Sequence, residues 1–263
     1  MKFRNGLLRL KRKFKMSKKR VDFGYLKVSP AEKTKLVGGV FKEVASRYDL
    51  MNDFMSFGSH RILKRILLNM SQISPNSRVL DLAGGTGDVT ALFASRLAKG
   101  GSICLADYSQ EMIEVARDRM LNQGFSNIDF TVAQAESLPF RSDHFNCVSI
   151  SFGFRNFTDK ELALQEIYRV LAPGGILLIL EFSKPTNRLL ETAYKGFQSL
   201  WPLAGKLAVG SKSPYQYLIE SIDKHPNQQA VKQMLEDANF QSVSFFNFLG
   251  GITSIHKGQK AIG

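Results

Sequence analysis

Three glycines close together give this chain its clearest chemical signal. Gly84, Gly85 and Gly87 lie in segment 79–88, which begins with the apolar residues of a buried strand and ends where a helix can start. Glycine adopts turn conformations that side chains forbid, and such a turn exposes backbone N–H groups at the helix N-terminus. The segment therefore predicts a strand, a turn that contacts a small ligand, and a helix.

The residues around the turn favour one kind of ligand. A dinucleotide site follows the pattern G-x-G-x-x-G/A, whereas Gly85 and Gly87 are followed by Asp88 and have no third small residue at the required place. A carboxylate at the helix start also repels phosphate. S-adenosylmethionine carries no phosphate, and its ammonium and sulfonium suit a nearby carboxylate such as Asp81. We therefore expect S-adenosylmethionine beside Asp81, Gly85 and Gly87.

Two further predicted strands end in residues that suit the nucleoside part of this ligand. Residues 102–106 read as a buried strand, and Asp107 ends it beside the glycine turn, where its carboxylate can accept hydrogen bonds from both ribose hydroxyls. A third strand at 128–132 leads to Gln134 and Ala135, where an amide can read the adenine edge. Each signal alone also fits a solvated strand end; their order and spacing favour the ligand site.

The positive charge of the chain is concentrated at its beginning. The formal net charge is +13, but residues 1–20 carry ten Lys or Arg and no acid, which leaves 26 basic against 23 acidic residues elsewhere. The remaining chain lacks the excess charge of a nucleic-acid-binding domain. We expect residues 1–22 to be a flexible basic tail. Contact with anionic lipid, an organelle presequence and a start site misassigned upstream of Met16 remain open.

The rest of the chain, 23–263, alternates between strand and helix patterns as one α/β domain does. Strands are expected at 78–83, 102–106, 128–132, 145–151, 175–182, 242–248 and 251–256, and helices at 88–99, 109–123 and 158–171. This rhythm predicts a mostly parallel sheet with helices on both faces, a cofactor-binding core over 78–183 and ligands at the strand carboxyl ends. Apolar spacing predicts an N-terminal helical cap over 30–70, and residues 226–263 supply a helix and the closing strands.

An apolar insertion separates the core from the closing strands. Residues 186–225 contain more large apolar side chains than one helix face needs. They either pack on the sheet or also form a lid over an apolar substrate. Cys104 and Cys147 fall in predicted buried strands and have no metal-ligand spacing with a histidine, so we expect core thiols and no metal.

Several segments resemble the ubiE/COQ5 family, the C-methyltransferases of ubiquinone and menaquinone biosynthesis. They are 37–41, 44–53, 56–58, 60–61, 81–88, 151–156, 168–171, 180–185 and 220–222. The glycine turn is shared by many methyltransferases, whereas the Tyr-Asp-Leu-Met-Asn run at 48–52 and the Arg-Asn pair at 155–156 are specific to few.

The resemblance implies a class I S-adenosylmethionine-dependent methyltransferase fold, Rossmann-like, with a seven-stranded mostly parallel sheet whose last strand is antiparallel. It implies cofactor contacts at Thr86, Asp107, Ser151 and the pair 134–135. Gln134 stands where the family usually has Asn or Asp, so its adenine contact departs from the pattern. The implied substrate is a polyprenylated quinol, either 2-polyprenyl-6-methoxy-1,4-benzoquinol or demethylmenaquinol.

Methylation of a ring carbon requires a ring hydroxyl that has lost its proton. Arg155 stays protonated, so we expect it to stabilise the phenolate or orient water, while Asn156 holds a ring oxygen; a salt-bridged loop arginine is the alternative. Tyr48 and Asp49 in the predicted cap are expected to relay the proton, unless they only cap and pack a helix. His60 has a suitable unperturbed pKa, but beside Arg61 a structural role is favoured.

Two other functions use the same motifs. One is an RNA or DNA base methyltransferase, although such enzymes typically have a motif like Asn-Pro-Pro-Tyr where this chain has 151–154, Ser-Phe-Gly-Phe. The other is a non-catalytic scaffold of a quinone-biosynthesis complex. For the quinol enzyme we expect a bacterial cytoplasmic protein, in peripheral contact with anionic membrane through its tail, with the mitochondrial matrix as the alternative. A homodimer or a quinone-biosynthesis complex is compatible with the sequence, and nucleic acid is not expected as a partner.

Overall fold

The computed structural model describes residues 20–44, 53, 56, 58–209 and 211–263. The predicted relay residues Tyr48 and Asp49 lie outside the described residues, as do the first 19 residues of the predicted tail.

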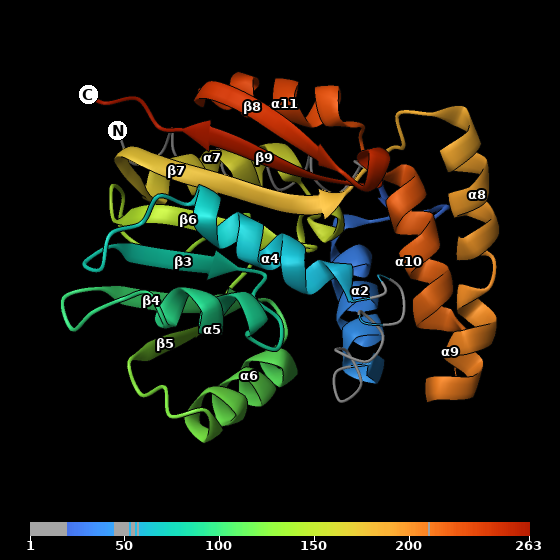
Figure 1. Cartoon of the computed structure of the whole chain (residues 1–263). Helices are drawn as coiled ribbons and strands as arrows, with labels where there is room; N and C mark the ends of the chain where they lie inside the picture. The colour runs from blue at the N-terminus through green and yellow to red at the C-terminus, as the bar shows by residue number, and fades with distance from the viewer. Residues whose placement is uncertain (1–19, 45–52, 54–55, 57, 210) are drawn as a thin grey trace, which may run out of the picture.

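A seven-stranded sheet forms the centre of the molecule, in the order β5-β4-β3-β6-β7-β9-β8 (Figure 1). The strands are β3 (Arg78–Leu82), β4 (Ser102–Asp107), β5 (Ile128–Val132), β6 (Phe145–Ser151), β7 (Leu171–Phe182), β8 (Gln241–Phe248) and β9 (Thr253–Gln259). The strands from β3 to β7 are paired in parallel, and β9 runs antiparallel to both of its neighbours. The predicted sheet, with its last strand antiparallel, is confirmed.

Helices cover both faces because successive strand residues point to opposite sides. In β7, Leu177 and Ile179 belong to the core that packs against α7 (Lys160–Val170) and α11 (Gln228–Asp237). Leu178 and Leu180 belong to the opposite core, beneath α4 (Ser59–Met70) and α5 (Asp88–Ala94). Helix α6 (Gln110–Asn122) packs on Leu105 of β4.

Several elements begin or end at other residues than predicted. Helix α5 ends at Ala94 rather than 99, because the chain turns and the N–H of Ala98 donates to Pro75 O. Helix α7 starts at Lys160, since the Asp159 side chain caps it by accepting the N–H of Leu162. Strand β7 starts four residues early, where Leu171 pairs with Phe145. Strand β9 starts late because residues 249–251 form the short 3-10 helix η3 (Leu249–Gly251).

A second group of elements lies at the carboxyl end of the parallel strands (Figure 1). It comprises the hairpin β1 (Val21–Phe23) and β2 (Leu26–Val28), then α2 (Pro30–Val44), and the insertion helices α8 (Arg188–Gln198), α9 (Trp201–Val209) and α10 (Ser213–Lys224). Helix α10 contacts α2, α9 and β1. The predicted cap is therefore divided: α2 lies over the strand ends, while α4 packs on a sheet face. The hairpin begins inside the predicted tail, at Val21.

Candidate functional site

The turn between β3 and α5 has the geometry that its glycines predict. Gly85 and Gly87 have φ of +55° and +89°, in the region where side chains are strained. The N–H of Gly85 donates to Asp107 Oδ2 at 3.0 Å, and the N–H of Ser109 donates to Asp107 Oδ1 at 2.9 Å. Each carboxylate oxygen keeps accepting capacity. Asp107 thus fixes the turn against β4 and can still bind a hydroxyl.

A cavity lies where the strand ends meet α2. Six predicted site residues line this central cavity, namely Gly85, Asp107, Gln134, Ala135, Ser151 and Asn156. The Oγ atom of Ser151 is buried and has no hydrogen-bond partner among the described residues. The structure therefore brings the ends of four strands to one cavity, as predicted, with an unsatisfied polar atom in its wall.

Helix α2 closes one side of the central cavity with Thr34, Val37 and Gly38. A Cβ atom on Gly38 would come within 3.2 Å of the Tyr108 ring, so glycine permits this close approach. The Thr34 hydroxyl lies 3.3 Å from the Thr158 hydroxyl across the cavity rim. Sequence reasoning expected a cap here but gave no role to these residues.

A smaller cavity continues from the central one. This tail cavity shares Ala83, Gly85, Ser151 and Phe152 with the central cavity, and its own lining includes Lys64, Asp81, Thr86 and Asp88. Gly87 is in neither lining and acts instead as the residue before α5. The other predicted residues of the turn, Asp81 and Thr86, are buried beside the tail cavity.

Asp81 is a buried carboxylate with neutral partners. It accepts hydrogen bonds from Thr90 Oγ1 at 2.7 Å and from Ser149 Oγ at 2.9 Å. Burial raises the pKa of Asp81 to about 6 because the charged form loses its hydration. A cation in the tail cavity would favour the ionised form, so this carboxylate suits the positive groups that the sequence assigned to it.

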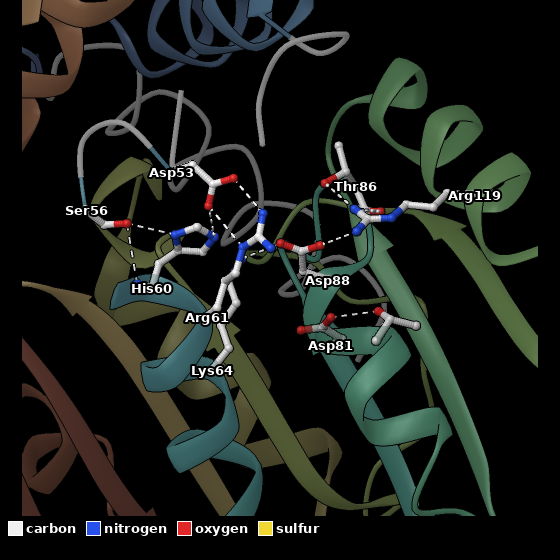
Figure 2. Close-up of polar contacts among 10 residues, drawn as sticks. Asp53, Ser56, His60, Arg61, Lys64, Asp81, Thr86, Asp88 and Arg119 are labelled. Carbon is white, nitrogen blue, oxygen red and sulfur yellow. Dashed lines mark hydrogen bonds and ion pairs between the residues drawn. The ribbon is translucent and has the colours of Figure 1, made fainter. Parts of the chain in front are cut away.

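Asp88 corrects one step of the sequence argument. It forms ion pairs with Lys64 at 2.8 Å and Arg119 at 2.6 Å, from α4 and α6 (Figure 2). Burial opposes ionisation of Asp88, but these two cations prevail and lower its pKa. The expected repulsion of phosphate at the helix start is therefore offset by two positive side chains. Of the two sequence features that disfavour a phosphate ligand, only the missing third small residue of the dinucleotide pattern remains.

An apolar cavity lies on the other side of Phe152. Its apolar lining residues are Leu63, Phe152, Phe182, Tyr194, Phe197, Leu249 and Ile252. The hydroxyl oxygens of Ser59 and Thr253, which also line it, are buried without hydrogen-bond partners among the described residues. Tyr194 and Phe197 belong to α8, so part of the apolar insertion covers this cavity while Trp201 and Tyr215 pack in the core.

His60 lies at the edge of the apolar cavity, held on both sides (Figure 2). Its Nδ1 is 2.8 Å from Ser56 Oγ, and its Nε2 is 3.7 Å from Asp53 Oδ1. Arg61 in turn donates to both oxygens of Asp53, at 3.0 and 2.6 Å. Burial lowers the pKa of His60, which favours a neutral imidazole able to accept a proton.

Arg155 and Asn156 belong to the short 3-10 helix η2 (Phe154–Asn156) and point to different surroundings. The Arg155 guanidinium is buried and pairs with Glu181 Oε1 at 2.7 Å, while its backbone N–H donates to Glu181 Oε2 at 3.0 Å. It also donates to Phe152 O. Arg155 lines neither the central nor the apolar cavity, so the structure favours the alternative of a salt-bridged loop arginine.

Asn156 lines the central cavity and accepts a hydrogen bond from the Tyr217 hydroxyl of α10 at 3.0 Å. Sequence reasoning missed Tyr217, Lys64 and Glu181. Glu181 carries a usable signal, a single acid inside the apolar run of β7. Tyr217 and Lys64 lie in helices that carry several other polar residues, so nothing in the sequence sets them apart.

In the part of the chain that the structure describes, no three His, Cys, Asp or Glu side chains form a group able to hold a metal ion. Within the same residues, the helices are too short or too polar to cross a bilayer. Cys104 and Cys147 are free buried thiols, as predicted, and burial raises their pKa values to about 11 and about 12.

Comparisons with known proteins identify the family and the fold. The profile of the "ubiE/COQ5 methyltransferase family" matches residues 28–260. "Ubiquinone/menaquinone biosynthesis C-methyltransferase UbiE" of Pectobacterium atrosepticum is 49% identical over 244 residues, covering 92% of this chain and 97% of that protein. A solved "SAM dependent methyltransferase from Aquifex aeolicus" has a TM-score of 0.54 at 17% identity, covering 74% of this chain and 88% of its own. The solved "[4+2]-Cyclase SpnF" has a TM-score of 0.60 at 17% identity, and the match covers 88% of this chain and 97% of the cyclase chain.

Proposed function

Because the chain belongs to the ubiE/COQ5 methyltransferase family and has the class I S-adenosylmethionine-dependent methyltransferase fold, we propose that it methylates a ring carbon of a polyprenylated benzoquinol or naphthoquinol. The observation that carries the proposal is the position of Phe152. This residue lines the central, tail and apolar cavities at once. A polar donor site and an apolar acceptor site therefore meet at one side chain.

The donor cavities fit S-adenosylmethionine by the chemistry of their walls. Asp107 would accept from the ribose hydroxyls, and the segment at Gln134 and Ala135 would contact the adenine. In the tail cavity, the Asp81 carboxylate suits the ammonium and the Lys64 ammonium suits the carboxylate of the amino-acid end. The unsatisfied Ser151 hydroxyl lies between these two parts. When bound, the donor supplies a methyl carbon made electrophilic by the sulfonium.

The apolar cavity suits a ring that carries two hydroxyls and a prenyl chain. Its aromatic and aliphatic side chains would bury the ring and the start of the chain. Its unsatisfied hydroxyls, on Ser59 and Thr253, are available to the ring oxygens. The protein must hold one ring hydroxyl deprotonated, keep ring and methyl in line, and accept the proton that the ring carbon loses.

Candidate residues for these proton steps come from two segments. Tyr48 and Asp49 remain predicted relay residues, and the neutral His60 at the cavity edge is a further acceptor. For Arg155 we propose a positioning role: its bonds to Glu181 and to Phe152 O hold segment 152–156, which carries Phe152 and Asn156. If Arg155 contributes to stabilising a phenolate, it does so indirectly, by fixing the position of segment 152–156.

The direct test supplies an isotopically labelled methyl donor with each reduced quinol and analyses the products by mass spectrometry. We expect a quinol heavier by one labelled methyl group, formed from the reduced ring and not from the oxidised quinone, since only the quinol ionises to a nucleophilic phenolate. The Asp107→Ala variant is the control for donor dependence. Donor binding by calorimetry without methylation of either quinol would refute the substrate and favour a scaffold.

We also propose peripheral contact with an anionic membrane at the bacterial cytoplasmic face, where a prenylated substrate resides. The support is the concentration of ten basic residues in segment 1–20. Deletion of residues 1–15 is expected to lower binding to anionic vesicles, and added salt is expected to weaken binding of the full chain. Equal binding with and without the segment would remove it from this role.

A further inference from the structure

A fourth cavity, of about 210 Å³, lies beyond Asn156 and has a strongly positive wall. The charged groups that line this cationic cavity are the cations Arg20, Lys33, Arg155, Lys160 and Lys224, and the carboxylate Asp22. Asp22 is already paired with Lys27 at 2.8 Å, and Arg155 with Glu181 at 2.7 Å. The cations of this wall therefore greatly exceed the carboxylates that could neutralise them.

Two lysines in this wall, the buried Lys33 and the partly buried Lys160, have only carbonyl oxygens as close partners. Lys33 Nζ donates to Phe157 O at 2.9 Å, and Lys160 Nζ lies 3.4 Å from the same oxygen and 3.2 Å from Arg155 O. No carboxylate among the described residues comes within ion-pair distance of either ammonium. Burial, with the positive charge of Lys33 next, lowers the pKa of Lys160 to about 8. Two like charges that share a carbonyl, one of them buried, are costly without a counter-ion.

The nearest acids cannot serve as that counter-ion. Glu136 accepts the backbone N–H groups of Thr158 and Asp159, at 2.7 and 3.0 Å. Glu181 is held by the Arg155 guanidinium and backbone. Both act on Lys160 only from beyond ion-pair distance.

His225 provides a second and independent observation. It lines the cationic cavity, is only 5% exposed, and its Nδ1 has no hydrogen-bond partner among the described residues. Burial and the surrounding cations hold its pKa well below the usual value, so the ring is neutral. A neutral imidazole carries one N–H and can place it on this nitrogen. An unsatisfied buried donor here calls for an acceptor in the cavity.

We propose that the cationic cavity binds a phosphate group, free or esterified to a small molecule, between Lys33, Lys160 and His225. Donors converge on the cavity from three elements, α2, α7 and the end of α10. A tetrahedral oxyanion presents oxygens in several directions and matches such donors better than a planar carboxylate does. Lysine is a common phosphate ligand that acts as a point charge.

Bound phosphate would also join α2 to the wall of the central cavity. Lys33 is next to Thr34, which lines the central cavity, and Thr158 lines both cavities. The anion would draw the Lys33 and Lys160 ammoniums together and hold α2 against segment 156–160. This site does not depend on the proposed quinol substrate, and the binding test needs no methyl donor.

The test measures thermal unfolding of the full chain against inorganic phosphate, with chloride at equal ionic strength as the reference. Glycerol 3-phosphate forms a second arm, which separates recognition of the free ion from recognition of an ester. We expect either ligand to raise the unfolding temperature in a saturable way. Lys160→Met should weaken phosphate affinity at least tenfold, whereas Lys99→Met, which removes an exposed lysine and the same charge, should leave it unchanged.

Chemical labelling covers the case in which Lys160→Met does not fold. Acetylation of Lys160 in the unmodified protein, followed by mass spectrometry, should slow when phosphate is present, while acetylation of Lys99 should not. No saturable shift with either ligand, or an equal shift in Lys160→Met and Lys99→Met, would overturn the proposal. So would unchanged acetylation of Lys160.

Discussion

The two sides of the site are built in different ways. On the donor side, residues from neighbouring strands meet through backbone groups: the Gly85 N–H binds Asp107, which follows it by 22 residues. On the opposite side, side chains meet across long separations. Tyr217 binds Asn156 across 61 residues and Lys33 binds Phe157 O across 124. The donor side is a local motif repeated along a sheet edge, and the opposite side is assembled by tertiary packing.

This difference has an energetic counterpart. Donor-side polar groups such as Asp81, Asp88 and Asp107 all have short partners. The opposite side combines a buried ion pair, Arg155 with Glu181, with hydroxyls and an imidazole nitrogen that have no partner in the described chain. Buried polar groups without partners lower stability. We infer that the donor side is largely complete before ligands bind, whereas the opposite side gains its missing hydrogen bonds from ligands.

Removal of Glu181 should give the largest effect on stability. Glu181→Ala leaves the buried Arg155 guanidinium without its carboxylate, which by analogy with broken buried pairs costs about 3–5 kcal/mol. Urea unfolding followed by circular dichroism measures this loss. Glu191→Ala, which breaks the exposed pair with Lys195, should leave the free energy of unfolding almost unchanged, because solvent screens an exposed ion pair. Equal losses in both variants would remove the energetic contrast between the two sides.

Asp81 sharpens the comparison through pH. Its pKa is raised from 3.8 to about 6 in the folded chain, so the unfolded chain loses the proton first and folding is favoured at low pH. As pH rises from 3.8 to about 6, wild type should lose about 3 kcal/mol of unfolding free energy relative to Asp81→Asn, by the relation of about 1.36 kcal/mol per pKa unit.

Paired urea titrations of wild type and Asp81→Asn from pH 4 to pH 8 measure this difference. Saturating S-adenosylmethionine should reduce it, since a cation beside Asp81 favours the ionised form. A difference that does not change with pH would mean that Asp81 titrates normally and that its burial has no such cost.

Asp107→Ala tests the donor side itself. Loss of the carboxylate removes the ribose contact and the acceptor for the Gly85 N–H, so S-adenosylmethionine affinity should fall at least tenfold in calorimetry, about 1.4 kcal/mol. Asp129→Ala, at an exposed position on the neighbouring β5, is the matched control and should bind normally. Unchanged affinity in Asp107→Ala would contradict the assignment of the ribose contact.

The sequence allowed prediction of the donor side far better than of its counterpart. The parallel strands, the glycine turn and Asp107 follow from local patterns, since strand, turn and strand-end residue are adjacent along the chain. Arg155 was assigned to the acceptor, but its guanidinium is held by Glu181, 26 residues away. The charge at Asp88 was misjudged for the same reason, since Lys64 and Arg119 come from other helices. Local patterns do not reveal which distant cation neutralises an acid.

Tyr217→Phe should give the smallest effect and addresses the boundary between the two sides. The change removes the hydrogen bond to Asn156 Oδ1 but keeps the ring that stacks on Phe23 at 4.4 Å. Burial raises the pKa of Tyr217 to about 12, so the hydroxyl is a donor at every working pH. Loss of one such bond corresponds to about 0.5–1.5 kcal/mol, or roughly a 2- to 12-fold change.

Asn156 lines the central cavity, where the donor is proposed to bind, but its predicted role is to hold a ring oxygen of the acceptor. If that role is right, the change should appear in kcat for quinol methylation while S-adenosylmethionine affinity stays within twofold. Tyr25→Phe, which removes an exposed hydroxyl contact to Asp223, is the matched control and should leave both quantities unchanged. A Tyr217→Phe variant that loses donor affinity instead would assign Asn156 to the donor side. Asn156 would then belong to the donor site, and the acceptor site, which is assembled by tertiary packing, would begin at α10.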